Sequence, residues 1–466
     1  MKLNYNNMMS SMLKERGITE EQIKELIPSI EKGHKILMEA RKNEALRIQN
    51  MQQWLALPYQ EEQLVNEIIK TADDFSAKYE NIISFGIGGS FLGNQMLQDA
   101  LKPSYWNEYP ALRCGRPRIY FEGRSMDGAP LEVLLNNLDP KKTGLIIISK
   151  SGGTTEPRCG FESAKKWLKD SLGDNYKKQI IAVTDPNKGD LRSWINQEKG
   201  IITFPLPEGV GGRFSVLSPS GLLTAALTGI DIKALLAGAE AMDSITKEEN
   251  IFKNPAYMYA ALQTIAYKKF GAKIAIMMPF ARNLKSLGEW YVQLLAESLG
   301  KKHDKQGKVV NLGRTPIPSV GNEDLHSTQQ NNIEGEYNKT ITFIKVKERS
   351  NLAVPKEEGS FLAQKSFDQI LDASLEATAA DLVNEKRMNC TLEIDKVDEA
   401  RIGELIFFFE IATAMEGELL NLNTYDQPGV EGYKNKMFGI LGKRGSEKAA
   451  QEVNAYKAKQ DKKFII

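Results

Sequence analysis

The segment Leu145-Ile-Ile-Ile-Ser149-Lys-Ser-Gly-Gly-Thr154-Thr-Glu-Pro157 carries the pattern on which the fold depends. Its four consecutive apolar residues, Leu145 to Ile148, predict a strand that is buried on both faces of a parallel sheet. The chain then turns polar and glycine-rich, and Pro157 suits the first turn of a helix, where its missing N–H costs nothing. A buried strand, a polar loop and a helix in this order predict an α/β fold.

The loop between that strand and helix also has the composition of an anion-binding site. Glycine lets the backbone approach a ligand closely, and the first N–H groups and the dipole of the helix favour negative charge. Lys150 adds a full positive charge, and the hydroxyls of Ser149, Ser151 and Thr154 add donors suited to phosphate oxygens. An ordinary polar turn is the alternative. We favour a phosphorylated ligand, because hydroxyls, lysine and glycines are concentrated in so few residues.

Composition predicts a globular protein of the reducing cytoplasm. The 466 residues are enough for two or three domains, and 41% hydrophobic and 26% charged residues are ordinary contents. A net charge of +1 gives no support for binding to nucleic acid or a membrane surface. No apolar run approaches the ~20 residues of a membrane span, and Met1–Asn7 lacks the apolar core of a signal peptide. Three cysteines and three histidines, widely scattered, predict neither a disulfide framework nor a metal centre.

Strands alternate with helices in two sets after a helical stretch at residues 18–76, which predicts two parallel sheets flanked by helices. We therefore expect a helical N-terminal region (1–75), a first α/β domain with the phosphate loops (76–235), and a second α/β domain with a helical tail (236–466). The predicted strands are Asn81–Phe85, Arg118–Phe121, Leu145–Ile148, Gln179–Val183 and Ile201–Phe204 in the first set, and Lys273–Met278, Lys308–Asn311, Ile341–Val346 and Asn389–Ile394 in the second.

A second glycine-rich loop, Gly86-Ile-Gly-Gly-Ser90, follows the first predicted strand. It has some likeness to a dinucleotide-binding fingerprint, but the third glycine of that pattern would fall at Phe91, and the chain has no P-loop. Gly89 and Ser90 are instead predicted to form a second wall of the phosphate site, since ligands of parallel sheets lie beyond the carboxyl ends of the strands. Close packing of a helix on the sheet is the alternative explanation for these glycines.

Two charged residues are candidates for the chemistry. Paired glycines precede Arg213 and allow backbone angles that aim its side chain into a cleft, where it would stabilise developing negative charge. A surface arginine in a turn is the alternative. Glu297 lies on the flank of the apolar face of a predicted helix, Lys285–Leu299, one turn beyond Gln293, and is a candidate general base. A solvated carboxylate at the boundary of that face is the alternative.

Two further segments carry polar residues among turns. His326 lies in Gly321-Asn-Glu-Asp-Leu-His-Ser, and a lone histidine is more often structural than catalytic. Gln427 and Lys434 follow a long predicted helix, in a turn-rich segment from which an amide and an ammonium group could reach a ligand. A connection between two helices is the alternative.

These segments together resemble the phosphoglucose isomerase (glucose-6-phosphate isomerase) family. Glu208–Gly221, EGVGGRFSVLSPSG, matches one signature of that family, and Gly417–Lys434, GELLNLNTYDQPGVEGYK, matches the other. Both glycine-rich loops, the segment Glu297–Lys301 and the surroundings of His326 also look like the family, in the family's order. The resemblance covers most of the chain.

The resemblance implies two sugar-isomerase domains and a homodimer with a shared active site. It implies reversible conversion of glucose 6-phosphate to fructose 6-phosphate, through ring opening and a cis-enediol, in glycolysis and gluconeogenesis, with no metal or organic cofactor. Glu297 matches the base that moves a proton between C1 and C2, and Arg213 matches the arginine near the enediolate. His326, acting in the neighbouring subunit's site, and Lys434 match the ring-opening groups. The positions that match substrate-binding residues are Gly89, Ser90, Ser149, Lys150, Ser151, Thr154, Gln293 and Gln427.

Other functions fit the sequence less well. A related enzyme with tandem sugar-isomerase domains makes glucosamine 6-phosphate, and it needs an amide-hydrolysing domain with an N-terminal cysteine, whereas this chain begins Met1-Lys-Leu-Asn. A dehydrogenase would need the missing glycine fingerprint. A non-catalytic sugar-phosphate-binding regulator stays as the alternative, and it would lack the base that Glu297 supplies.

Overall fold

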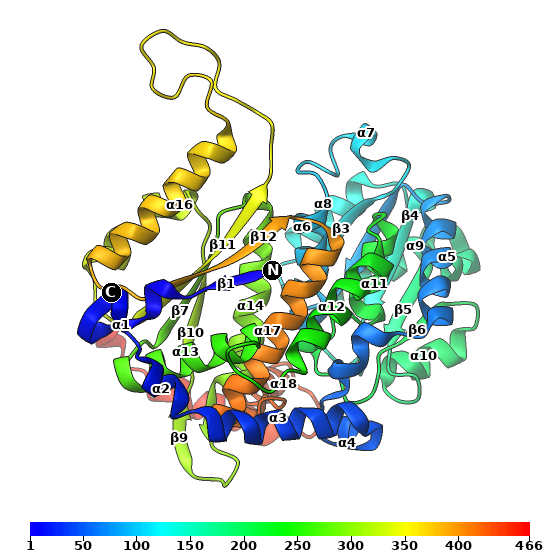
Figure 1. Ribbon diagram of the computed structural model, residues 1–466. Coiled ribbons are helices and arrows are strands. Elements are labelled where there is room, and N and C mark those ends of the chain that lie inside the picture. Colours follow the sequence, from blue (N-terminus) through cyan, green and yellow to red (C-terminus); the bar gives the residue numbers. More distant parts are fainter. The chain divides into compact units, whose positions relative to one another are not determined.

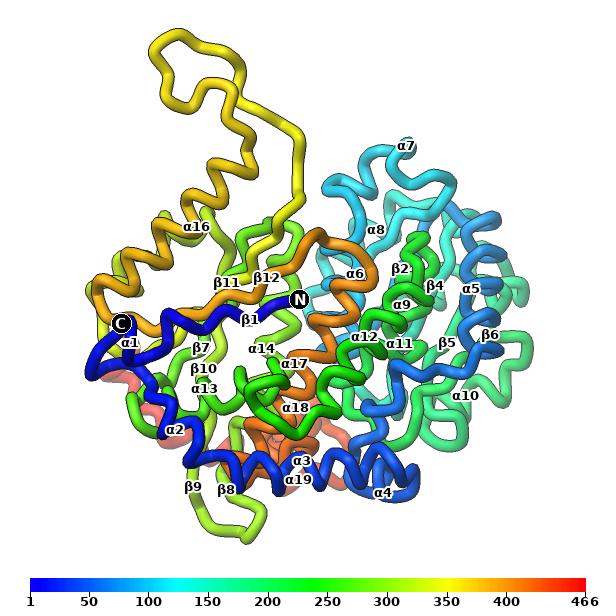
Figure 2. Tube along the Cα trace, viewed as in Figure 1, coloured from blue at the N-terminus to red at the C-terminus, as the bar shows by residue number.

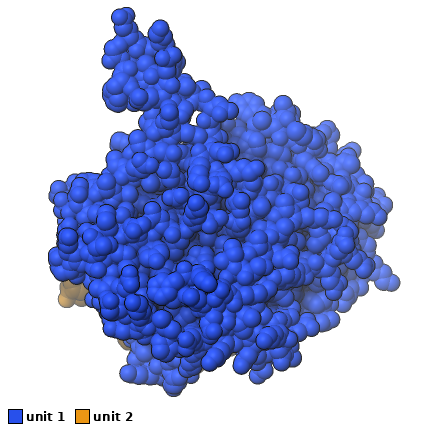
Figure 3. Space-filling model, in the orientation of Figure 1, with its two compact units in different colours: residues 1–425 blue, residues 426–466 orange.

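The computed structural model describes residues 1–466 and divides into two compact units, Met1–Tyr425 and Asp426–Ile466 (Figure 3). Each unit is described by itself. The larger unit contains both α/β sheets, and the smaller one contains only helices. The domain boundaries expected near residues 75 and 235 stay a prediction. No helix of the chain is both long enough and apolar enough to cross a membrane.

The first sheet contains five parallel strands in the order β3-β2-β4-β5-β6 (Figure 1). The apolar run of the opening segment is its central strand, β4, with β2 on one side and β5 on the other. All five predicted strands are confirmed to within two residues at each end. The observed bounds are β2 Asn81–Phe85, β3 Arg118–Glu122, β4 Thr143–Ile148, β5 Ile180–Thr184 and β6 Ile202–Pro205.

Helices cover both faces of this sheet, because successive residues of each strand point to opposite sides. Leu145 and Ile147 belong to one apolar core with residues of the helices on that face, whereas Ile146 and Ile148 belong to the other, larger core. The covering helices are α8 Ala129–Asn137, α9 Thr155–Leu172 and α10 Asp190–Glu198 on the first face, and α5 Glu62–Ser76, α6 Leu92–Leu101 and α11 Pro219–Leu227 on the second. The predicted α/β class is confirmed.

The second sheet has the strand order β1-β12-β11-β7-β10, in which only β1 is antiparallel to its neighbour. Helix α16 covers one face, and α13, α14 and α17 pack on the other within the large core. The strands are β1 Lys2–Asn4, β7 Ile274–Pro279, β10 Thr315–Pro318, β11 Lys339–Glu348 and β12 Asn389–Lys396. The helices are α13 Pro255–Phe270, α14 Lys285–Leu299, α16 Phe367–Asn384 and α17 Glu399–Leu419.

One predicted strand of the second sheet is wrong in its placement. Residues 308–311 do form a strand, β9 Val309–Leu312, but it pairs with β8 Lys301–His303 in a separate antiparallel hairpin. Its place at the edge of the sheet is taken by β10, which contains Pro316 and Pro318. Proline cannot donate a ladder hydrogen bond, and an edge strand tolerates it because only one neighbour, β7, must be paired. The prolines therefore hide this strand from sequence inspection.

The N-terminal helices and the loop before α16 complete the larger unit. Residues 349–366, between β11 and α16, extend away from the sheet (Figure 2). Arg349 holds the base of this loop through ion pairs with Asp368 (3.4 Å) and Asp372 (2.6 Å). The remaining α-helices are α1 Ser10–Leu13, α2 Glu20–Lys24, α3 Ile27–Lys42, α4 Glu44–Gln49, α7 Pro110–Arg113, α12 Ile232–Thr246 and α15 Gln329–Glu334. The 3-10 helix η3 Gln53–Tyr59 follows α4.

The smaller unit contains two α-helices, α18 Glu431–Ile440 and α19 Glu447–Ala458, with the short 3-10 helices η10 Pro428–Val430 before them and η11 Lys462–Phe464 after them. A Cβ atom at Gly439 would lie 2.5 Å from the backbone nitrogen of Ala450, so glycine permits the close approach of α18 to α19. The helical tail predicted from composition is confirmed in α19.

Helix α17 carries a carboxyl group that the fold leaves without a partner. Glu410 is 1% exposed, neither of its oxygens is hydrogen-bonded, and burial raises its pKa well above the ordinary value of 4.5. The folded state therefore holds a proton that the unfolded state releases, so the free energy of unfolding falls as pH rises above about 4.5. This group is destabilising at neutral pH.

We expect Glu410→Met to raise the free energy of unfolding by about 1–3 kcal/mol at pH 7.5, with a smaller gain at pH 4.5. Denaturant unfolding at the two pH values measures both differences. Glu416 on the same helix is the matched control, because it is equally buried but paired with Arg314 at 2.7 Å. Glu416→Met should lower stability by about 3–5 kcal/mol, since it leaves a buried arginine unpaired. A gain at Glu410 that is identical at both pH values would contradict the proton linkage.

Candidate active site

Glu297 lies on α14, which has the predicted bounds and the predicted buried face. Leu287, Trp290, Leu294 and Leu295 on that face are fully buried, so the helix is fixed firmly between the two sheets. The Glu297 side chain retains 30% of its exposure, at the boundary between core and solvent. Helix α14 thus holds the Glu297 carboxylate in a fixed position at the edge of the core.

Arg213 reaches this carboxylate from the short helix η7 Gly212–Phe214. Its Nη1 donates to Glu297 Oε2 at 3.2 Å, and its Nε donates to Ser298 Oγ at 2.7 Å. Its Nη2 donates to the backbone carbonyl of Thr424. The arginine is only 2% exposed, so the alternative of a surface arginine in a turn is wrong.

Gln293 and the first glycine-rich loop meet the same cluster. Gln293 Nε2 donates to Glu297 Oε1 at 3.1 Å, one turn away on α14. A Cβ atom at Gly88 would lie 2.8 Å from Gln293 Nε2, and one at Gly89 would lie 1.9 Å from the carbonyl oxygen of Gly212. Glycine is therefore required for the loop to lie against both α14 and η7. The alternative explanation for these glycines, close packing, is therefore confirmed. A role of the same loop in binding is compatible with it.

The loop after β4 is organised by its own hydroxyls. Ser149 Oγ accepts from the backbone N–H of Gly152 at 3.0 Å, and Ser151 Oγ accepts from Gly153 at 3.1 Å. Each hydroxyl keeps its hydrogen for donation to a ligand oxygen. Thr154 is the N-cap residue of α9, but its side chain makes no capping bond. Hydroxyl donors and the amino end of a helix thus occur together, as an anion site requires.

Lys150 connects this loop to the segment that carries Arg213. Its Nζ donates to the carbonyl oxygen of Val210 at 3.4 Å. Burial lowers the pKa of Lys150, while the carboxylates of Asp185 and Glu208 act in the opposite direction. A half-buried ammonium group beside a polar loop is a strong attractor for an anion, because few waters compete with the ligand.

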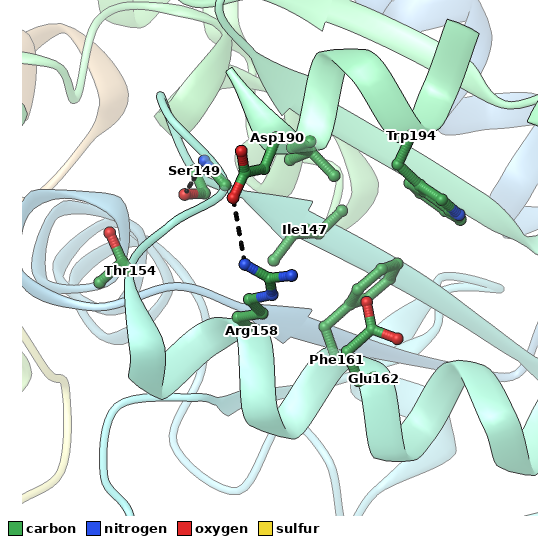
Figure 4. A pocket seen from close by; sticks show the side chains of 10 residues that line it. Ile147, Ser149, Thr154, Arg158, Phe161, Glu162, Asp190 and Trp194 are labelled. Atoms are coloured by element: carbon green, nitrogen blue, oxygen red, sulfur yellow. Dashed lines mark hydrogen bonds and ion pairs between the residues drawn. The ribbon is translucent and has the colours of Figure 1, made fainter. Parts of the chain in front are cut away.

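A pocket extends from this loop between α9 and α10 (Figure 4). Ser149 and Thr154 lie at one end of it, and Phe161 and Trp194 form an apolar region at the other. Arg158 and Asp190, paired at 3.1 Å, cross the space between these ends. Both partners are more than half exposed, so this ion pair adds little stability.

Three predicted residues come from other segments, namely His326, Gln427 and Lys434. His326 is exposed at the end of η9 Glu323–His326 in the larger unit. Gln427 and Lys434 belong to the smaller unit, where Lys434 pairs with Glu431 at 3.0 Å. Their roles stay predictions.

The structure also reveals contacts of the Arg213 segment that sequence reasoning missed. The backbone N–H of Gln53 donates to the carbonyl of Gly209 at 3.1 Å, and Gln60 donates to the carbonyl of Leu217 at 2.9 Å. The rings of Trp54 and Phe214 stack with their centroids 5.0 Å apart. Helix η3 and Gln60 therefore support the segment that carries Arg213. The only sequence signal was the cluster of apolar residues in η3, which does not indicate what it packs against.

Comparisons with known proteins point to a single family. A model of the family described as "Phosphoglucose isomerase" matches residues 63–458. The chain is 38% identical to the glucose-6-phosphate isomerase of Carboxydothermus hydrogenoformans, over 88% of this chain and 89% of the relative. It is 35% identical to the enzyme of the same name from Fusobacterium nucleatum, over 94% and 96% of the two chains.

Solved structures show the same fold. A Thermus thermophilus protein described as hypothetical superimposes with a TM-score of 0.83 at 30% identity, over 95% of this chain and 99% of that one. A glucose-6-phosphate isomerase of Chlamydia trachomatis gives a TM-score of 0.76 at 20% identity, over 98% and 96%, which supports the fold. From the family match and the extent of the sequence identity, the chain belongs to the phosphoglucose isomerase family.

Proposed function

We propose that this chain catalyses the reversible isomerisation of glucose 6-phosphate to fructose 6-phosphate, as a step of glycolysis and gluconeogenesis. The observation that carries the proposal is the pairing of Glu297 with the buried Arg213 at the end of α14. A carboxylate and a fixed cation side by side are what proton transfer next to a carbonyl group requires. The names of the relatives identify the substrate class.

In the proposed reaction, the open-chain aldose loses its C2 proton to the Glu297 carboxylate. The electron pair forms the C1–C2 double bond of a cis-enediolate, whose negative charge on oxygen Arg213 stabilises. Glu297 then returns the proton to C1, the hydroxyl proton of O2 passes to O1, and the oxygen at C2 becomes the carbonyl of the ketose. Gln293, which donates to Glu297 Oε1, keeps that carboxylate oriented during both transfers.

The phosphate is proposed to bind at the two glycine-rich loops, remote from the reacting carbons. Ser149, Lys150, Ser151 and Thr154 would provide charge and hydroxyl donors, with Gly89 and Ser90 on the opposite wall, as the cluster at the ends of β2 and β4 permits. Contacts with the phosphate orient the sugar, and they persist while the bonds at C1 and C2 change.

The ring-opening groups and the assembly form a second part of the proposal. His326 and Lys434 would transfer protons between the ring oxygen and O1, and Gln427 would contact the sugar. The exposure of His326 on its own chain supports action in the site of a second subunit of a homodimer. A cytoplasmic location suits sugar phosphates as substrates. No observation favours the alternative of a non-catalytic regulator, because the base and the arginine are both present.

Glu297→Gln should lower kcat for fructose 6-phosphate by about 10³-fold, because the amide cannot accept the proton. A coupled assay with glucose-6-phosphate dehydrogenase measures the rate, in buffer with EDTA because the proposed chemistry needs no metal. Glu289→Gln on the same helix is the matched control and should leave kcat unchanged. Undiminished turnover in Glu297→Gln would show that Glu297 is not the catalytic base.

Lys150→Ala should raise KM by about tenfold or more and change kcat less, since it removes a charge-assisted contact to the phosphate. The same assay over a range of substrate concentrations separates the two constants. Lys166→Ala, at an exposed lysine of α9, serves as the control for loss of one positive charge. The phosphate-loop assignment fails if KM stays at the wild-type value.

Mixing subunits tests whether the site is shared. A dimer of one Glu297→Gln chain and one His326→Ala chain contains one intact site only if the histidine acts across the interface. Random exchange should then restore about a quarter of wild-type activity from two inactive parents. Activity that stays at the level of the parents would place His326 in the site of its own chain.

A further inference from the structure

The guanidinium group of Arg213 donates hydrogen bonds from three different nitrogens. Nε donates to Ser298 Oγ at 2.7 Å, Nη2 donates to the carbonyl of Thr424, and Nη1 donates to Glu297 Oε2. Arginine pairs most strongly with a carboxylate when two nitrogens share its two oxygens. Here Nη1 faces Glu297, because the serine hydroxyl and the backbone carbonyl hold the other two nitrogens.

The position of Ser298 makes it the more informative of these two anchors. It follows the proposed base directly on α14, and consecutive helical residues point about 100° apart. Glu297 therefore lies at the boundary with solvent, while Ser298 is fully buried on the adjoining face. A single rigid helix thus fixes both the carboxylate and the group that holds the arginine beside it.

We propose that Ser298 is a positioning residue, whose hydroxyl holds the Arg213 guanidinium with Nη1 toward Glu297 and without itself touching the substrate. This inference rests on the proposed function, in which Glu297 is the base and Arg213 stabilises the enediolate. Without the hydroxyl, the Nε–H group loses its serine partner in a buried place, and the guanidinium turns to form a two-nitrogen pair with Glu297. That pair occupies both carboxylate oxygens and withdraws the positive charge from the enediolate.

We expect Ser298→Ala to lower kcat by about tenfold, because a misplaced electrophile loses part of its stabilisation of the transition state. KM should stay within about twofold, since other residues make the proposed phosphate contacts. Ser298→Thr retains the hydroxyl and should recover most of the lost kcat. Thermal unfolding of each variant shows whether added bulk, rather than hydrogen bonding, affects the result.

Ser286→Ala is a matched control on the same helix. Its hydroxyl is also buried and donates to the carboxylate of Asp99, about 18 Å along the helix from Ser298. Loss of this hydroxyl should leave kcat unchanged within about twofold. An equal fall of kcat in both alanine variants would overturn the inference, because any defect of α14 would then explain it.

A double-mutant comparison with Arg213 distinguishes a positioning role of Ser298 from a merely structural one. Lysine lacks the Nε–H donor, so in an Arg213→Lys background the change Ser298→Ala should lower kcat by no more than about twofold. A tenfold fall in that background would show that Ser298 acts independently of the arginine and would overturn the proposal. Wild-type protein without activity on fructose 6-phosphate would contradict the proposed function, whereas an active wild type with a neutral Ser298→Ala contradicts only this inference.

Discussion

Satisfying the buried guanidinium of Arg213 is the constraint on which the site depends. A charge removed from water is costly unless every donor finds a partner, and three partners of Arg213 come from two well-separated segments. Helix α14 supplies Glu297 and Ser298, and the residues that follow α17 supply the carbonyl of Thr424. The arginine therefore holds the ends of two helices together at the same point where the chemistry is proposed to occur.

Contacts made by two loops complete this arrangement. Gly88 and Gly89 bring the loop after β2 against Gln293 and Gly212, and Lys150 brings the loop after β4 to Val210. Both loops follow neighbouring strands of one parallel sheet, so their proximity is a consequence of topology. The sheet thus positions the proposed phosphate contacts, and the packing of α14 positions the proposed base. The proposed phosphate binding thus depends on the first sheet, whereas the proposed proton transfer depends on α14.

Sequence patterns predict the first sheet well, because its strands are continuous apolar runs such as Leu145–Ile148 between clear turns. They fail at β10, where Pro316 and Pro318 are typical of a loop, and at β1, which is too short to show a period. Glu297 and Arg213 could be nominated from their surroundings, but their contact depends on long-range packing that no local pattern contains. Ser298 is visible in the sequence only as part of an apolar face, since its partner is 85 residues away in the chain.

Helix η3 suggests how turnover could vary among related enzymes while the reacting residues stay the same. The family match begins at residue 63, yet Gln53, Trp54 and Gln60, which precede it, contact the segment that carries Arg213. Substitutions there leave every signature motif intact. They would nevertheless shift the arginine by fractions of an ångström, and stabilisation of the transition state is sensitive to displacements of that size. Sequence drift in this supporting helix is therefore a means of adjusting the rate without changing substrate recognition.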